Sequence, residues 1–492
     1  MIIATLSHLP VSSRRTALLR FLREGAAALL LTGLVAGCAG AKPAPASAGH
    51  SRALETPLDR YVAAPDPAYA WQAVTNARIN GVTVTIIDLT SQSWLTTNEV
   101  DRTLWRHWLV VARPDALEHS TALLMIGGGN NKDNRLPKPS DALMQMARQT
   151  RSVAAELRMV PNQPLVFGHD GRERVEDDLI AYTWDKFLRT GDDRWPARLP
   201  MTKAAVRAMD TVTAFCASPA GGGAKVDTYV VAGGSKRGWT TWTTAVVDKR
   251  VVAVCPIVID LLNIVPSFEH HYRTYGFFAP AVEDYVSAGI MDWMDTSEFK
   301  RLMQVVEPFE YRDRLTMPKL IVNASGDQFF LPDSSQFYFD RLPGVKYLRY
   351  VPNADHSLKN TDAWETLMAW HHATLNRTPL PRFSWKHEGG DAIRLQTVDQ
   401  PTEVRLWQAT NPAARDFRLD VIGPVWTNQV LRQDDRGAYL GRVASPSQGY
   451  TAFFVELTYP LGGPAPLKLT TDVRVTPDTL PHPPYQPKPL KR

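Results

Sequence analysis

The stretch that most constrains the fold of this chain runs from Val226 to Trp242, where an apolar, β-branched run ends in two glycines and a serine. A segment that can begin a helix follows directly. The pattern predicts a strand that turns sharply into a helix with Ser235 at the bend, which is a nucleophile elbow. Such a bend lifts the hydroxyl clear of the sheet, and the small residues Gly233 and Gly234 let strand and helix pass closely.

The elbow departs from the common G-x-S-x-G pattern. Arg237 stands where the second glycine is usual, and Gly238 comes one residue later. On this motif alone, a glycine-rich turn with a solvent-facing serine remains an open alternative.

Two further polar residues follow predicted strands in the order that α/β-hydrolases use. Asp327 comes just after the strand 319–322, and His356 comes just after the strand 345–350. A serine hydroxyl is a poor nucleophile until a base removes its proton. His356 would act as that base, and Asp327 would hold its imidazole in the required tautomer.

Other interpretations of these residues stay open. Asp327 could make an Asx turn, and His356 could be an ordinary loop histidine. Asp260, at the end of the strand that follows the elbow helix, is an alternative acid. We favour Asp327 because the Gly326–Asp327 turn presents its side chain at the strand tip.

An acyl-transfer site also needs donors for the developing oxyanion. Lys236, next to the nucleophile, and the triple glycine Gly127, Gly128 and Gly129 occupy the expected places, although the glycines could also form a plain flexible turn. The chain has no phosphate-loop motif and no histidine or cysteine spacing typical of a metal site. We therefore expect neither a cofactor nor a metal.

From about Tyr61 the pattern alternates between strands and helices, which predicts an α/β fold with a doubly wound, mostly parallel sheet. The expected strands are 81–87, 105–111, 121–126, 164–167, the elbow strand, 251–259, 319–322 and 345–350. The expected helices are 140–157, 178–188, 203–215, the elbow helix to 247 and 362–375.

The predicted α/β-hydrolase domain covers residues 58–380. Length, composition and strand pattern also predict an insertion within it and a separate C-terminal region. Residues 263–314 are too long for a simple crossover and rich in aromatics, so we expect a helical, lid-like insertion over the site. Residues 381–478 show short alternating strands, among them 403–408, 417–421 and 452–459, which favours a β-sandwich-like domain. The Pro- and Lys-rich tail, 479–492, is expected to be disordered.

The N-terminus has the features of an export signal. In residues 1–37, arginines precede an apolar run too short to span a bilayer, and Leu34 to Cys38 resembles a lipobox. Residues 38–57 then form a flexible tether. These features predict lipidation at Cys38, which would anchor the protein to a membrane. The expected location is the periplasmic side of the bacterial cell envelope, as an outer-membrane lipoprotein, or outside the cell as a secreted protein. An ordinary cleaved signal is the alternative.

Charge and cysteine content exclude other classes. The leader carries four arginines and one glutamate, so the formal charge falls from +5 to +2 without it. Such a balance gives no support to nucleic-acid binding. Cys216 and Cys255 could pair in an oxidising compartment or remain two separate buried thiols.

Several motifs together resemble the PhoPQ-activated pathogenicity-related protein family. They are Gly233 to Trp242, Asp260 to Asn263, Ala324 to Phe330 and Asn353 to Leu358. The resemblance implies an exported α/β-hydrolase with Ser235, Asp327 and His356 as its triad, and no settled substrate. The elbow also resembles that of glucuronoyl esterases, where the basic residue after the serine assists the oxyanion.

The sequence therefore predicts a serine hydrolase that cleaves an ester or an amide through an acyl-enzyme. Because the insertion should close the pocket, we expect small acyl esters or short peptides, with sugar-acid esters as the alternative substrate. A non-catalytic binding or signalling protein of the envelope is the second hypothesis, because Arg237 at the elbow could block the serine.

Overall fold

The computed structural model describes residues 55–490. The expected leader, Cys38 and most of the tether lie outside these residues. Among the helices of residues 55–490, none combines the length and the apolar character needed to cross a bilayer.

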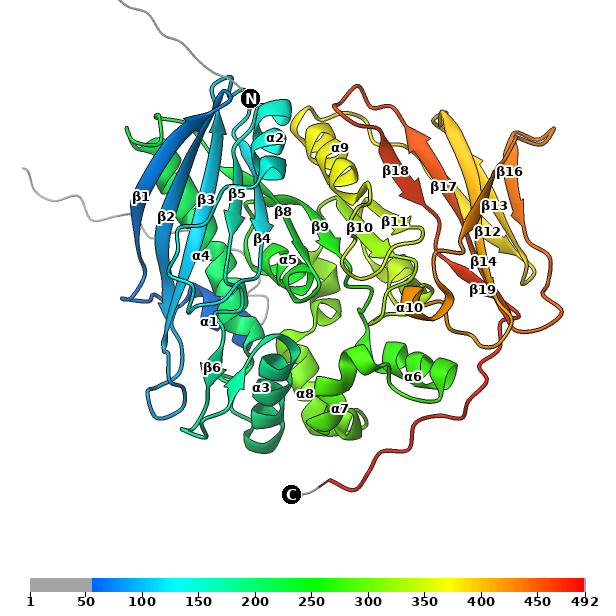
Figure 1. The fold of residues 1–492 in the computed structure, drawn as a ribbon, viewed down its shortest axis with the longest axis horizontal. Helices are drawn as coiled ribbons and strands as arrows, with labels where there is room; N and C mark the ends of the chain where they lie inside the picture. Colours follow the sequence, from blue (N-terminus) through cyan, green and yellow to red (C-terminus); the bar gives the residue numbers. More distant parts are fainter. Residues whose placement is uncertain (1–54, 491–492) are drawn as a thin grey trace, which may run out of the picture. The chain divides into compact units, whose positions relative to one another are not determined.

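A central sheet forms the middle layer of the described chain (Figure 1). Four strands pair antiparallel, and from β5 onward the strands run parallel. In spatial order they are β1 (Ala70–Ile79), β2 (Val82–Ser93), β3 (Leu104–Pro114), β5 (Ala154–Leu157), β4 (Thr121–Ile126), β8 (Thr228–Gly234), β9 (Val251–Ile257), β10 (Lys319–Ala324) and β11 (Lys346–Val351). This order confirms the expected α/β-hydrolase class.

Alternating side chains of the parallel strands fill two separate cores. Leu124 and Val231 belong to the core that contains α4 (Arg198–Ala217) and α5 (Lys236–Val247), and Leu123 and Val230 belong to the core that contains α2 (Asp141–Thr150) and α9 (Ala363–Leu375). Because successive residues of a strand point to opposite faces, a nearly continuous apolar run covers both sides of the sheet. The remaining described helices before the insertion are α1 (Pro57–Ala63) and α3 (Glu176–Thr190).

Two of the expected elements are wrong. The helix expected over 140–157 ends at Thr150, where Arg151 adopts a left-handed conformation with φ 51°, and the chain then forms β5. The apolar residues of 140–157 fit the period of a helix and that of a strand. Pairing with β3 and β4 makes residues 154–157 a strand. The strand expected over 417–421 is replaced by a short helix, α10 (Leu419–Ile422). The small strands β6 (Leu165–Val166) and β7 (Glu173–Arg174) form a separate pair.

The insertion between β9 and β10 is helical, as expected. It contains α6 (Ile264–Tyr275), η1 (Pro280–Val282), α7 (Glu283–Ser287), η2 (Ile290–Trp293), α8 (Ser297–Val306) and η3 (Pro308–Arg314). The buried carboxyl of Glu307, after α8, accepts hydrogen bonds from the backbone N–H of Ile264. This contact joins the end of the insertion to its beginning.

The C-terminal strands are sandwich-like, but their larger sheet continues the central one. Strand β11 pairs with β18 (Leu467–Thr470), followed by β17 (Tyr450–Tyr459), β14 (Glu403–Asn411) and β15 (Thr427–Val430), while β19 (Arg474–Thr476) pairs with β17. A second sheet holds β12 (Phe383–Glu388), β13 (Ala392–Thr397) and β16 (Ala438–Arg442). The two sheets share one core with α9.

The tail was expected to be disordered, and the structure corrects this for residues 479–490. The segment runs from β19 along the insertion, drawn in red beneath α6 in Figure 1. Its composition is polar and rich in proline, but Tyr485 and Leu490 give it apolar side chains that pack against the core.

A buried ion network joins the hydrolase sheet to the C-terminal strands, and we expect it to be essential for stability. Arg349 on β11, with only 2% of its side chain exposed, donates to Glu456 on β17 and, at 2.9 Å, to Asp362. Arg349→Met leaves a buried carboxylate without its partner, which should lower the free energy of unfolding by about 3–5 kcal/mol in urea titrations. Arg405→Met, which breaks a more exposed pair with Glu403, should cost less than about 1 kcal/mol. Equal losses in the two variants would contradict this assignment.

Candidate active site

The predicted elbow is present at the junction of β8 and α5. Ser235 has φ 56° and ψ −124°, a positive-φ conformation that non-glycine residues rarely adopt. Its backbone N–H donates to the carbonyl of Ile257 on the neighbouring strand at 2.8 Å, which fixes the bend. Strain of this kind persists where the surrounding structure imposes it, and it is typical of functional sites.

Two glycines allow the close approach of strand and helix. A Cβ on Gly233 would lie 2.6 Å from the carbonyl oxygen of Arg237, and one on Gly238 would lie 2.8 Å from a methyl group of Ile259. Gly234, in contrast, has only a contact at 3.9 Å. The elbow therefore needs glycine at 233 and 238. Position 237, where the common pattern has its second glycine, holds arginine instead.

Arg237 points away from the serine. Its Nε donates to the carbonyl of Val160 at 2.6 Å, and its Nη2 donates to Glu176 at 2.5 Å. A Cβ on Gly128 would lie 2.6 Å from the same guanidinium group, so Arg237 packs against the glycine loop. The structure thus removes the argument that this side chain blocks the nucleophile.

Asp327 and His356 lie together at the ends of the adjacent parallel strands β10 and β11. The imidazole Nδ1 of His356 is 2.8 Å from Oδ2 and 3.0 Å from Oδ1 of Asp327. Asp327 is 4% exposed and also accepts a hydrogen bond from the N–H of Phe329 at 2.8 Å. Because a carboxylate only accepts, Nδ1 carries the proton and Nε2 is free to act as a base.

Phe329 connects this pair with the serine. Its ring lies 4.3 Å from the imidazole of His356, and it lines the same cavity as Ser235. Among the hydrogen bonds of residues 55–490, none joins the Ser235 hydroxyl to His356. Such catalytic hydrogen bonds often form only when substrate binds.

Asp260, the alternative acid, has other partners. Its two carboxyl oxygens accept hydrogen bonds from the hydroxyls of Tyr338 and Tyr350, each at 2.6 Å. Burial raises the pKa of Asp260 to about 8, despite these hydrogen bonds, which act to lower it. A carboxyl engaged in this way does not orient His356.

Asp260 should make the protein less stable as the pH rises. Its carboxyl ionises near pH 3.8 in the unfolded chain but keeps its proton up to about pH 8 in the folded one. Between these values the folded state binds more protons, so stability falls with rising pH. The stability of Asp260→Asn relative to the natural chain should therefore increase from pH 5 to pH 8 by on the order of 4 kcal/mol. Urea unfolding of both proteins at the two pH values measures the change, and a constant difference would contradict a raised pKa.

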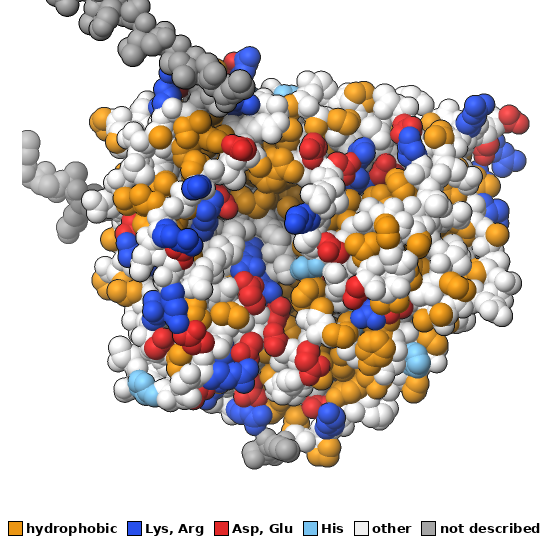
Figure 2. All heavy atoms as spheres, in the orientation of Figure 1, with side chains coloured by type: hydrophobic (Ala, Val, Ile, Leu, Met, Phe, Trp, Pro, Cys, Tyr) orange, Lys and Arg blue, Asp and Glu red, His pale blue; other side chains and the backbone are white. Residues whose placement is uncertain are grey.

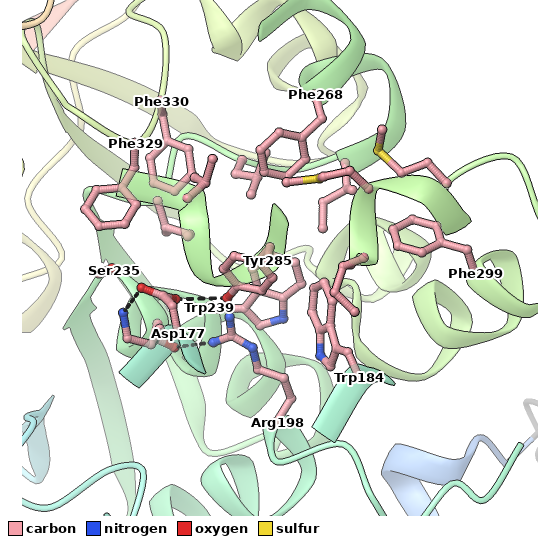
Figure 3. Close-up of a pocket in the computed structure, with 18 residues that line it drawn as sticks. Asp177, Trp184, Arg198, Ser235, Trp239, Phe268, Tyr285, Phe299, Phe329 and Phe330 are labelled. Carbon is pink, nitrogen blue, oxygen red and sulfur yellow. Dashed lines mark hydrogen bonds and ion pairs between the residues drawn. The ribbon is translucent and has the colours of Figure 1, made fainter. Parts of the chain in front are cut away.

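A cavity lined mainly by apolar side chains leads away from Ser235 (Figure 3). Its aromatic lining residues are Trp184, Trp239, Phe268, Tyr285, Phe299, Phe329 and Phe330. The free space inside is about 40 Å³, room for about three water molecules. The insertion supplies much of the lining, including Phe268, Ile290 and Phe299, and so covers the site as expected for a lid.

A polar cluster lies beside the serine in this cavity. Lys236 pairs with Asp177 at 2.7 Å and with Glu176 at 3.3 Å, and Tyr285 of the insertion donates to Asp177 at 2.9 Å. In Figure 3, Asp177, Tyr285 and Arg198 lie together below the apolar slot. Burial acts to raise the pKa of Glu176, but the hydrogen bond from Arg237 and the charges of Arg237 and Lys236 hold it at about 2. Nothing in the sequence pointed to Asp177 or Tyr285, because they are 108 residues apart.

The expected oxyanion donors need revision. The ammonium group of Lys236 is committed to its carboxylates, but its backbone N–H stands at the first position of α5, where helical N–H groups have no intrahelical acceptor. The N–H of Gly127 donates to the carbonyl of Leu157 at 2.7 Å and is therefore not available. Gly128 and Gly129 follow at the carboxyl end of β4, next to the elbow strand.

No metal centre or disulfide is found within residues 55–490. The structure brings no three potential ligands together there, and the adjacent His270 and His271 have separate partners, Asp333 and the N–H of Ala279. Cys216 and Cys255 are both buried free thiols, so they do not pair.

Figure 2 shows a hollow near the middle of the face that is also seen in Figure 1, with side chains of both charges along its lower rim.

Comparison with known proteins identifies the family. The PhoPQ-activated pathogenicity-related protein family matches residues 58–418. The chain belongs to this family. The match confirms the resemblance carried by the elbow and strand-end motifs. A relative of this family member, autocrine proliferation repressor protein A of Dictyostelium discoideum, is 36% identical over 457 residues, covering 87% of this chain and 92% of that protein.

Solved structures similar to this family member include esterases and an acylaminoacyl peptidase. Acetyl xylan esterase from Paenibacillus sp. R4 is 14% identical, with a TM-score of 0.45, and the match covers 64% of this chain and 92% of that chain. Glucuronoyl esterase from Solibacter usitatus is 12% identical, with a TM-score of 0.36, and the match covers 65% and 91%.

Proposed function

We propose that this protein is a serine hydrolase that cleaves an ester or an amide through an acyl-enzyme. The observation that carries the proposal is the strained Ser235, placed at a strand-to-helix bend and lining a cavity whose wall, Phe329, touches the imidazole of the His356–Asp327 pair. Serine, aspartate and histidine follow each other in the chain order of α/β-hydrolases.

In this mechanism, Ser235 attacks the acyl carbon while Nε2 of His356 takes the hydroxyl proton. Asp327 keeps the imidazole oriented and stabilises its charged form. The backbone N–H of Lys236 donates to the oxyanion, with help from the loop of Gly128 and Gly129. The proton then passes to the leaving group, and water releases the acyl group from the serine.

The cavity favours an apolar acyl group over a sugar acid. Its walls are aromatic and aliphatic, and the charged groups that reach it, Lys236, Asp177 and Arg198, already bind protein partners. A hydroxylated ring placed there would lose hydrogen bonds to water without replacing them. The acyl side of the substrate is thus a short apolar chain or an apolar residue of a short peptide.

Labelling with a fluorophosphonate tests the proposal. The purified protein should react, and mass spectrometry should find the adduct on Ser235, because only an activated serine hydroxyl attacks this probe. Heat-denatured protein serves as the control. Native protein that stays unlabelled, or an adduct on another residue, would contradict the proposal.

A second candidate is a signalling protein that acts by binding, since the Dictyostelium relative is named a repressor of proliferation. The two candidates differ in their need for the nucleophile. If Ser235→Ala fully restores the phenotype of a deletion strain, binding is the function; failure despite normal expression supports catalysis.

We also propose export to the cell envelope with a lipid on Cys38. Support comes from the sequence of residues 1–38 alone, with its arginines, short apolar run and lipobox-like end. Cells grown with labelled palmitate should yield labelled protein, and Cys38→Ser should remove the label. Equal labelling of both proteins would refute the assignment.

A further inference from the structure

The C-terminal segment, residues 479–490, makes specific contacts with the insertion at two places. The first lies at the end of α6. The backbone N–H of His482 donates to the carbonyl of Arg273 at 3.0 Å, and its ring lies against Gly276, where an added Cβ would come within 2.8 Å of the imidazole. Gly276 is the residue that ends α6, with φ 78°. The segment therefore contacts the helix at its C-terminus.

The second contact is centred on Tyr485. Its ring packs against Tyr272 and Phe278, with centroid distances of 5.0 and 4.9 Å. Its hydroxyl donates to Oδ1 of Asp292 on η2 at 2.6 Å, and the backbone N–H of Lys488 donates to the same oxygen at 2.7 Å. One tyrosine thus joins α6 to η2, two elements with 14 residues between them in the chain.

Both elements form walls of the cavity beside Ser235. Phe268 lies one turn before Tyr272 on α6 and lines the cavity. Met291 precedes Asp292 directly, and Met294 follows two residues later, and both also line the cavity. Because residues four apart lie on the same face of a helix, Tyr272 lies next to Phe268, and Asp292 is directly joined to Met291. The contacts of Tyr485 are therefore made beside the residues that line the acyl site.

The composition of the segment suits it to this task. Prolines at 481, 483, 484, 487 and 489 restrict the backbone before docking. A chain that is already extended loses less conformational entropy when it binds, so a few contacts are enough to hold it.

We infer that the C-terminal segment is a latch, with Tyr485 as its positioning residue, that fixes the roof of the acyl cavity and so limits the length of acyl group that the site accepts. The inference rests on the proposed function for its substrate, but the contact between latch and insertion does not. When the latch is removed, α6 and η2 lose their common support, and the nearly filled cavity can widen.

The test compares the natural chain with a chain that ends at Asp478 and with Tyr485→Ala. For each, kcat/KM is measured on p-nitrophenyl butyrate and on p-nitrophenyl octanoate. The ratio of octanoate to butyrate should rise about fivefold or more in both variants, the change expected when a partly buried hydrogen bond and its packing are lost. Tyr485→Phe, which keeps the ring, should give an intermediate ratio. Gln486→Ala changes an exposed neighbour and should leave the ratio unchanged.

Hydrogen exchange of residues 264–294, measured on the same proteins, needs no turnover. Exchange should be faster without the latch and unchanged in Gln486→Ala. If wild-type protein hydrolyses neither ester but exchange responds, the latch stands and the proposed function fails. Unchanged exchange, or an unchanged ester ratio in an active protein, overturns the inference.

Discussion

Ser235→Ala is expected to abolish turnover, with kcat falling by ~10⁴–10⁶-fold, because no other group can form the acyl-enzyme. The substrate should still bind, since the cavity walls remain in place. The measurement is kcat on a p-nitrophenyl ester, with Ser287→Ala, an exposed serine of α7, as the control. Residual activity within tenfold of the natural chain would show that another residue is the nucleophile.

The same position should separate activity from stability. Alanine at φ 56° is as strained as serine, whereas glycine adopts this conformation without strain. Ser235→Gly should therefore be as inactive as Ser235→Ala but more stable, by about 1 kcal/mol in urea unfolding. A glycine variant no more stable than the alanine variant would mean that the elbow is not strained. In that case the geometry of Ser235 would not reflect a requirement of the chemistry.

The sequence was informative where chemistry follows directly from a local pattern. The bend at Ser235 requires glycines within three residues, and Asp327 and His356 each come just after an apolar run, so the strand ends and their polar residues could be predicted together. The sheet order then places those ends side by side, which is why the fold class and the Asp327–His356 contact followed from the pattern.

The sequence was not informative where a side chain chooses between distant partners. The partners of Lys236, Asp177 and Glu176, lie some 60 residues before it on α3, and no local signal shows that they draw its ammonium group away from an oxyanion. The tyrosines that hold Asp260 are equally remote. The prediction of a disordered tail was wrong for a related reason. Composition reports the average of a segment, whereas the contacts of a single ring, Tyr485, decide whether the segment packs on the insertion.

Asp327→Asn is the second change with a large expected effect, and it distinguishes the two candidate acids. An amide at 327 cannot accept the Nδ1 proton in the same way, so His356 loses the tautomer that leaves Nε2 free. The shape of the site stays nearly the same, because the two side chains have the same size. We therefore expect kcat to fall ~10⁴-fold with little change in KM.

The matched control is Asp260→Asn. With a pKa of about 8 its carboxyl is already largely neutral at pH 7, and both of its oxygens face tyrosine hydroxyls instead of the histidine. An amide of the same shape can replace it there, so kcat at pH 7 should stay within about threefold of the natural value, a change of less than 1 kcal/mol. Measuring kcat for both variants on one ester at pH 7 decides between the acids. A large loss in Asp260→Asn together with a small one in Asp327→Asn would reverse the assignment, because the triad would then have to draw its acid from the end of β9 instead of β10.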